Sequence, residues 1–370
     1  MKKTLAAVAV LGAFAGSALA ADVTLYGRID TGLQLHDWED TVGGKSVDGT
    51  DWSMESGSLT GSRVGIKGSE QISENLTVGF VLEKGFKGDS GKAGDSTKAF
   101  DRESVIYVKS DFGTVYAGRI NSMWSDGGST NFWAGNYVAL GTGNGVGVGA
   151  GLMVGNSRAD NRVSYVSPEF AGFKAYAEYS FGADGDENTS GSDRPAALGL
   201  NYKNGAFGAG MVVTYKNEKS WIAKAENVPA HQEEQEDEYT VNVGTNYDFG
   251  LALVKVGAQY YKNADKVGTF DDVKVAGEEL EGYAVSVGAD VPAWGGTWTM
   301  GVVYADGEDK AANATLEYKG YDVAAYYQYP LSKRTKVYAG VGYEKLEATN
   351  DNVKTEHEDV KAMMGMAHYF

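Results

Sequence analysis

Basic side chains recur at alternating positions in the first half of the chain, where they could supply fixed positive charge. The set consists of Arg28, Arg63, Lys67, Arg102 and Arg162. A ring of fixed charges around a water-filled passage selects ions by their sign. The pattern therefore predicts the wall of a pore constriction. The alternative for each residue is a structural ion pair with a nearby carboxylate, because such pairs cost little in a wet lumen.

Residues 121–160 read as neither helix nor strand and hold ten glycines and two tryptophans, Trp124 and Trp133. Loops of this length in compact proteins are usually functional or disordered. Because the stretch carries few charges, we expect it to fold inward and narrow a pore, with both tryptophans anchoring it by packing. Stacking of the tryptophans on sugar-like solutes, or a mobile surface loop, are the alternatives.

Charged residues at this loop complete the predicted constriction. Asp126 and Asp160 are its acids, and Arg119 precedes it. Arg119 shares strand parity with Val115 and Ala117, so the pattern leaves its direction open.

Other chemistry is weakly represented. The acidic run 233–238 beside His231 offers ligands for a divalent cation, but a solvated external loop is the simpler account. No nucleophile, base and orienting group recur at a recognisable spacing, and no glycine-rich phosphate loop precedes a helix. The sequence predicts no catalytic residue, no metal and no cofactor.

The first 20 residues have the pattern of a cleaved signal peptide, with Lys2 and Lys3, an apolar run and a small-residue cleavage site. Its removal takes the net charge from −17 to −19, which argues against a nucleic-acid partner. The chain has no cysteine, so an exported protein of this size must close without disulfides.

The mature chain alternates in hydrophobicity with period two, which is typical of strands. About sixteen strands are expected, at residues 23–35, 63–67, 78–82, 100–109, 114–120, 161–167, 173–181, 196–203, 207–221, 238–247, 251–261, 280–291, 297–304, 319–329, 335–344 and 358–370. Short connections alternate with long polar ones such as 37–58. This alternation predicts an antiparallel up-and-down barrel with short turns at one end and long loops at the other. Pairing of the first strand with the last would close the sheet and leave no strand edge exposed.

The polarity of the two strand faces favours a membrane. Apolar residues share one face while Arg and Lys share the other, whereas small soluble barrels have an apolar interior. Aromatic residues gather near strand ends, as an interfacial girdle requires. In a bilayer a closed barrel satisfies every backbone polar group.

The chain resembles the general porins of Gram-negative outer membranes along residues 21–370. The resemblance is carried by DVTLYGR (22–28), GSRVGIKG (61–68), FGTVYAGR (112–119), SPEFAGF (167–173), LSKRT (331–335) and AHYF (367–370). It implies a homotrimer of sixteen-stranded barrels whose third external loop, here 121–160, folds into the lumen.

The resemblance also implies several partners. These are outer-membrane lipid and lipopolysaccharide, small hydrophilic solutes and ions, and the barrel-assembly machinery, which would recognise the C-terminal strand with His368 and Phe370. The leading functional hypothesis is passive diffusion through a water-filled outer-membrane channel. The alternatives are a substrate-selective channel and a surface adhesin or structural barrel with an occluded lumen. An outer-membrane hydrolase is disfavoured, because the sequence shows no recognisable set of catalytic residues.

Overall fold

The computed structural model describes residues 22–123, 128–132, 152–155, 158–183, 193–217, 219–222, 231–234, 236–270 and 273–370. Its secondary structure is built from strands. Among these residues, no helix has the length and apolarity needed to cross a bilayer.

The strands follow one another along the chain with few long interruptions. In order they are β1 (Thr24–Val42), β2 (Lys45–Ser56), β3 (Arg63–Ser73), β4 (Leu76–Gly85), β5 (Glu103–Ser110), β6 (Gly113–Asn121), β7 (Arg158–Val166), β8 (Phe173–Ser180), β9 (Arg194–Asn204), β10 (Phe207–Asn217), β11 (Lys219–Ile222), β12 (His231–Glu234), β13 (Glu238–Asp248), β14 (Leu253–Phe270), β15 (Val273–Ala293), β16 (Gly296–Asp309), β17 (Glu317–Pro330), β18 (Thr335–Asn350) and β19 (Val353–Tyr369).

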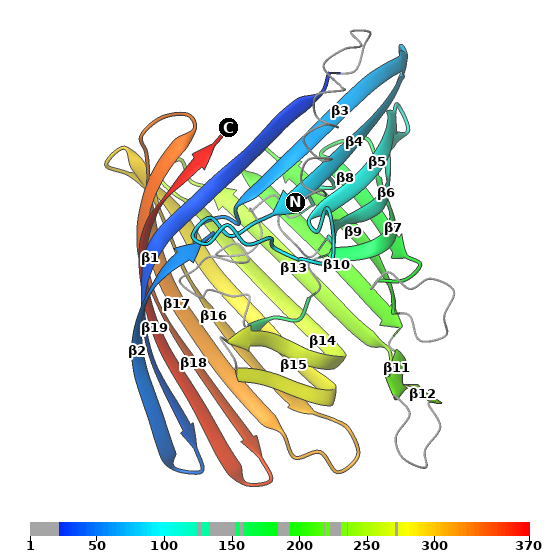
Figure 1. The fold of residues 1–370 in the computed structure, drawn as a ribbon. Helices are drawn as coiled ribbons and strands as arrows, with labels where there is room; N and C mark the ends of the chain where they lie inside the picture. Colours follow the sequence, from blue (N-terminus) through cyan, green and yellow to red (C-terminus); the bar gives the residue numbers. More distant parts are fainter. Residues whose placement is uncertain are drawn as a thin grey trace, which may run out of the picture.

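One antiparallel sheet of seventeen strands closes on itself through the pairing of β1 with β19 (Figure 1). β2 pairs with residues 31–42 of β1, and β3 pairs with residues 24–28 of the same strand. Because these two segments share one place beside β1, the barrel has sixteen strand positions. The predicted sixteen-stranded up-and-down barrel is therefore confirmed. β11 and β12 form a separate hairpin.

The interruption between β2 and β3 is held by a buried carboxylate. Asp30 of β1 accepts hydrogen bonds from the backbone amides of Leu59 and Thr60 at 3.0 and 2.7 Å, and from the Tyr338 hydroxyl of β18 at 2.5 Å. These three partners satisfy charged oxygens that burial would otherwise destabilise. Asp30 thus ties the 57–62 segment to the closing side of the barrel.

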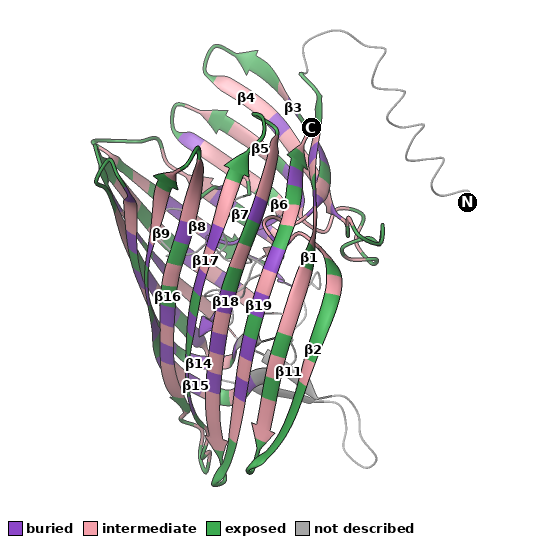
Figure 2. Cartoon of the chain, turned by 90° about the vertical axis from the view of Figure 1, so that its left-hand side faces the viewer, coloured by how far each residue is buried: buried purple, intermediate pink, exposed green. Residues whose placement is uncertain are grey.

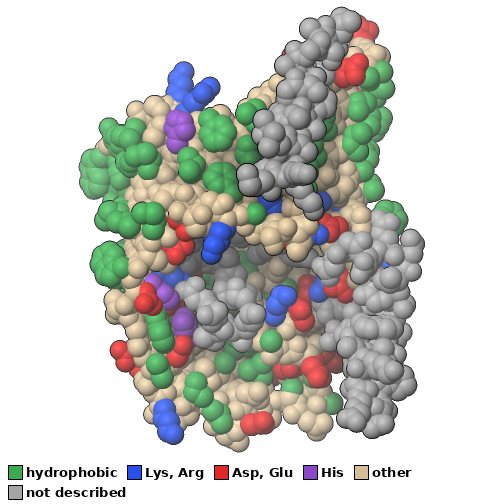
Figure 3. All heavy atoms as spheres, in the orientation of Figure 1, with side chains coloured by type: hydrophobic (Ala, Val, Ile, Leu, Met, Phe, Trp, Pro, Cys, Tyr) green, Lys and Arg blue, Asp and Glu red, His purple; other side chains and the backbone are tan. Residues whose placement is uncertain are grey.

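The strands alternate between apolar outward and more polar inward positions. On β1, Leu25, Ile29 and Leu33 are exposed, whereas Arg28 and Asp30 face inward. Figure 2 shows more and less buried residues alternating along β18 and β19, and Figure 3 shows hydrophobic side chains gathering on the outer surface. An apolar outer surface of this kind matches the hydrocarbon of a bilayer.

Several connections predicted as polar loops are paired strands. β1 continues to Val42 and returns as β2 through a turn at Gly43 and Gly44, both with positive φ, and β14 and β15 extend to Phe270 and Val273. The prediction of a loop at 37–58 was wrong there, because hydrophobic alternation stops when both faces of a hairpin meet water while backbone pairing continues.

The inner wall is unequal around the circumference. Along β14–β19 it carries mainly apolar and aromatic side chains, including Tyr261, Val303, Tyr318, Tyr326 and Leu346. The charged side chains predicted from the sequence lie instead on β1 and on β3–β8. The β14–β19 side of the inner wall thus combines an apolar cluster with a separate group of buried charged residues on β17–β19, whereas the predicted cations lie on the other side.

Candidate constriction site

The carboxylate of Glu83 on β4 contacts side chains from two other strands, β1 and β3, and from the residue before β5. Arg102 Nε lies 2.7 Å and Arg63 Nη1 3.3 Å from Glu83 Oε1, and the Tyr26 hydroxyl donates to Oε2 at 3.2 Å. Their inward positions follow from strand parity and register, since Arg63 and Gly65 of β3 lie opposite Gly85 and Glu83. Charge-assisted hydrogen bonds of this kind fix both guanidinium groups.

Two further predicted cations flank this carboxylate. Arg28 lies opposite Arg63 in the β1–β3 register, and its guanidinium carbon is 5.7 Å from the centre of the Tyr369 ring. Lys67 Nζ is 5.2 Å from the centre of the Tyr26 ring. Aromatic faces attract cations at such distances. We call Tyr26, Arg28, Arg63, Lys67, Glu83 and Arg102 the Glu83 cluster.

A second acid adjoins the Glu83 cluster. Glu103 of β5 lies directly opposite Glu83 in the β4–β5 register and accepts hydrogen bonds from the amide and hydroxyl of Ser129 at 2.8 and 2.9 Å. Arg158 of β7 interacts electrostatically with Arg102, Glu83 and Glu103. The cations of this part of the wall outnumber the two acids, so the wall carries net positive charge.

Arg119 belongs to a separate group. It shares the parity of Val115 and Ala117, which is opposite to that of the Glu83 cluster, and a register shift follows Gly118. Arg119 Nη1 and Lys98 Nζ each lie 2.5 Å from a different oxygen of Asp160. Asp160 therefore bridges two cations outside the Glu83 cluster instead of opposing it across the passage.

The connection that supplies Lys98 is ordered by short polar turns. The carboxylate of Asp95 accepts hydrogen bonds from the hydroxyl and the amide of Thr97 at 2.6 and 2.7 Å. These bonds stabilise the charged form and hold the pKa of Asp95 below its ordinary value.

Arg162 of β7 is a buried structural partner and not an exposed member of the passage. Its side chain is 1% exposed, and Nη1 lies 3.4 Å from Oε2 of Glu178 on β8. Glu178 Oε1 also accepts a hydrogen bond from the Met123 amide at 3.4 Å. The pair thus links two strands to the start of the long connection.

We expect Arg162→Leu to lower the free energy of unfolding by about 3–5 kcal/mol, because Glu178 would keep a buried charge without its cation. Urea unfolding of the refolded barrel in detergent measures this loss. The matched double variant with Glu178→Leu should recover most of it. Equal stability of the single variant and the parent would show that the pair contributes nothing.

Two described parts of the long connection contact inward-facing residues. Phe132 packs edge-on against Tyr176 of β8, with ring centres 4.8 Å apart, and its carbonyl accepts a hydrogen bond from Asn201 of β9 at 3.0 Å. A Cβ on Gly199 would lie 2.7 Å from the Phe132 ring, so this glycine makes room for it.

The second part, residues 152–155, contacts β14 and β17. The amide of Val154 donates to Gln259 Oε1 at 2.7 Å, and its carbonyl accepts from Gln259 Nε2 at 2.6 Å. Leu152 packs over Gly320, where a Cβ would lie 2.7 Å from Leu152 Cδ2. The segment buries Leu152, Met153 and Val154 against the apolar half of the wall.

The remaining predicted residues divide into two sets. Trp124, Asp126 and Trp133 lie outside the described residues. Phe370 exchanges backbone hydrogen bonds with Gly27 at 3.0 Å and covers this glycine with its ring, and His368 Nδ1 lies 3.0 Å from the Thr335 hydroxyl oxygen. Both C-terminal residues thus lie where β19 meets its neighbours.

Sequence reasoning did not assign Glu83, Glu103, Arg158 or Glu178 to the site. The inward parity of Glu83 was available, because it alternates with Leu82 and Lys84. That of Glu103 was not, because a strand at 100–109 with Arg102 inward would turn Glu103 outward, whereas β5 begins at Glu103, which lies opposite Glu83. No local pattern identifies Glu83 as the common partner of three side chains that lie on two strands and on the residue before β5.

Comparison with known proteins agrees with this architecture. A family model described as Gram-negative porin matches residues 6–349. An outer membrane porin protein of Bordetella pertussis is 30% identical over the whole of both chains, and outer membrane porin protein 32 of Delftia acidovorans is 28% identical over 93% of this chain and 90% of its own.

Solved structures share the fold. An anion-selective porin from Comamonas acidovorans aligns with 95% of this chain and 100% of its own, with a TM-score of 0.62 at 23% identity. The sixteen-position barrel and the family match lead to one conclusion. The chain belongs to the Gram-negative porin family and is an outer-membrane porin that forms a channel for passive diffusion of ions and small hydrophilic solutes.

Proposed function

We propose that the Glu83 cluster and the loop 121–160 together form the constriction of this channel. The observation that carries the proposal is the hydrogen bonding of Ser129, a loop residue, to Glu103, which adjoins the Glu83 cluster on the inner wall. Solutes would pass between the loop and this wall. The excess of guanidinium groups over carboxylates would favour anions there.

The finer features of the family are also proposed for this chain. We infer that residues 1–20 are removed as a signal peptide and that the mature barrel assembles as a homotrimer in contact with outer-membrane lipid and lipopolysaccharide. A Vibrio cholerae outer membrane protein of similar fold has been solved in a trimer form, at 18% identity and a TM-score of 0.59. We also infer that the barrel-assembly machinery recognises His368 and Phe370 when the barrel is inserted into the outer membrane.

Current through purified protein in a planar bilayer under a salt gradient tests the constriction proposal. Conductance steps in groups of three, with a reversal potential of the sign expected for anions, would support a trimer of open pores with a basic constriction. A cation-selective potential would mean that the acidic residues elsewhere dominate. Inserted, folded protein that passes no current would contradict the proposal and favour an occluded barrel.

A further inference from the structure

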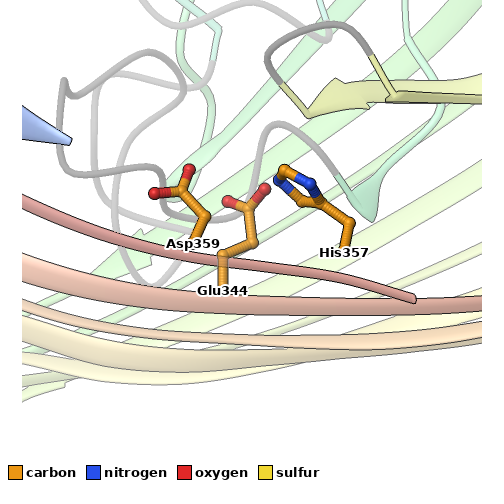
Figure 4. A group of neighbouring side chains, drawn as sticks. All are labelled: Glu344, His357 and Asp359. Carbon is orange, nitrogen blue, oxygen red and sulfur yellow. The ribbon is translucent and has the colours of Figure 1, made fainter. Parts of the chain in front are cut away.

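Three potential metal ligands meet on the inner wall at a place that the constriction does not use. Glu344 of β18 and His357 and Asp359 of β19 project to the same side of their strands (Figure 4). Their ligand atoms all lie within 4.8 Å of one another, and the residues are 5%, 4% and 2% exposed. Glu344 lies directly opposite Asp359 in the strand register. Small rotations of the side chains would bring all three onto one ion.

The orientation of His357 provides an independent indication. Its Nδ1 lies 2.6 Å from Oδ1 of Asp40 on β1. A carboxylate accepts hydrogen bonds, so Nδ1 carries the proton and Nε2 carries the lone pair of the neutral ring. Metal-binding histidines commonly donate their other ring N–H to a carboxylate in this way, which fixes the tautomer and the ring direction.

The charges of this wall region also favour a cation. Asp322, Glu344 and Asp359 occupy one row across β17, β18 and β19, each opposite the next in register. Like charges directly opposite each other destabilise a sheet. Lys361 Nζ, 2.7 Å from Asp359 Oδ2, offsets one of them, and His36 Nε2 lies 3.1 Å from Asp359 Oδ1. A divalent ion between Glu344 and Asp359 would reduce the repulsion along this row.

The surroundings separate the cluster from the constriction. His36 follows Arg28 by eight residues on β1, a separation of about 26 Å along a strand at about 3.3 Å per residue. Leu346, opposite His357 in register, flanks Gly320 together with Leu152. The cluster therefore borders the apolar packing of residues 152–154, where electrostatic interactions are stronger than in open water.

We propose that Glu344, His357 and Asp359 bind one divalent transition-metal cation in the pore wall, with Asp40 positioning His357. One imidazole nitrogen and two carboxylate oxygens form a ligand set that suits Zn²⁺ and similar ions. Three protein ligands leave one coordination position open, which water or a small anion would fill.

Titration of the chelator-treated, refolded full-length barrel with ZnCl₂ in a calorimeter tests the proposal. We expect one saturable site per chain. His357→Ala and Asp359→Asn should weaken binding by about 100-fold or more, and Asp40→Asn by about 10- to 100-fold. Glu358→Gln is the matched control, because this carboxylate lies between the two β19 ligands but faces outward to Lys345; it should bind as the parent does.

Two results would overturn the proposal. The first is the absence of saturable binding to the parent protein. The second is unchanged affinity in His357→Ala, which would move the ion to another site such as the acidic run near His231. If the variants fail to fold, His231→Ala decides, because Co²⁺ bound to an imidazole and carboxylates gives visible absorption bands that bulk Co²⁺ at equal concentration does not reproduce. Bands that persist in His231→Ala would support the proposal, and their loss would move the ion to the acidic run near His231.

Discussion

Replacing both Arg63 and Arg102 with alanine is expected to shift the ion selectivity of the channel toward cations. The two guanidinium groups share Glu83, so their removal leaves Glu83 and the adjacent Glu103 facing the passage. A unit charge about 4 Å from an ion changes the electrostatic energy of that ion by about 1 kcal/mol even in water. The anion-to-cation permeability ratio should therefore fall by about tenfold at low salt, and less at high salt.

The reversal potential under a salt gradient measures this change. Lys333→Ala with Arg334→Ala is the matched control, because it removes two cations from the exposed turn between β17 and β18. The control variant should have the same reversal potential as the parent protein. A potential that stays unchanged in the Arg63 and Arg102 variant would show that ions do not pass beside the Glu83 cluster.

Deletion of residues 141–151 is expected to raise the size limit for solutes. The described residues on either side contact opposite parts of the wall, Ser129 and Phe132 at β5, β8 and β9, and residues 152–155 at β14 and β17. If the loop constricts the lumen, removal of residues 141–151 between these contacts would widen the opening through which solutes pass. The effect should be severalfold for the largest sugars that pass and small for salt.

Rates of liposome swelling with sugars of increasing size measure the limit. Deletion of residues 223–230, in the connection between β11 and β12, is a control of similar kind. It should leave the rates unchanged. The same limit in parent and 141–151 variant would place that part of the loop away from the solute path.

Period-two patterning predicted the barrel and the direction of most of its charged side chains, because inside and outside differ sharply within the bilayer. Arg28, Arg63, Lys67 and Arg102 were placed together on this basis, and the structure brings them around Glu83. The pattern failed where that contrast disappears. Residues 37–51 of the hairpin of β1 and β2 are mostly polar on both sides, so the pairing of this part left no period-two signal, although Trp52 and Met54 of β2 are exposed.

Long-range pairing explains the other differences. Arg162 shares the inward parity of the constriction arginines, but its burial against Glu178 depends on β8 and on Met123. The apolar inner wall at Tyr318 and Tyr326 was not predicted either, because segments with apolar residues on both faces lose their alternation. Such assignments require knowledge of which residues oppose each other across the lumen.

The pairing of β1 with β19 has a consequence for how the chain folds. Arg28 lies opposite Tyr369, so the first and last strands of the barrel must meet before the sheet closes. Contacts between distant parts of a sequence form slowly, because the entropy of closing the loop is lost before the contact stabilises the chain. In hydrocarbon, an open sheet with unpaired edges is strongly disfavoured. Insertion and closure should therefore be coupled, and a chain that stops short of its last strand should stay outside the membrane as a substrate for chaperones and proteases.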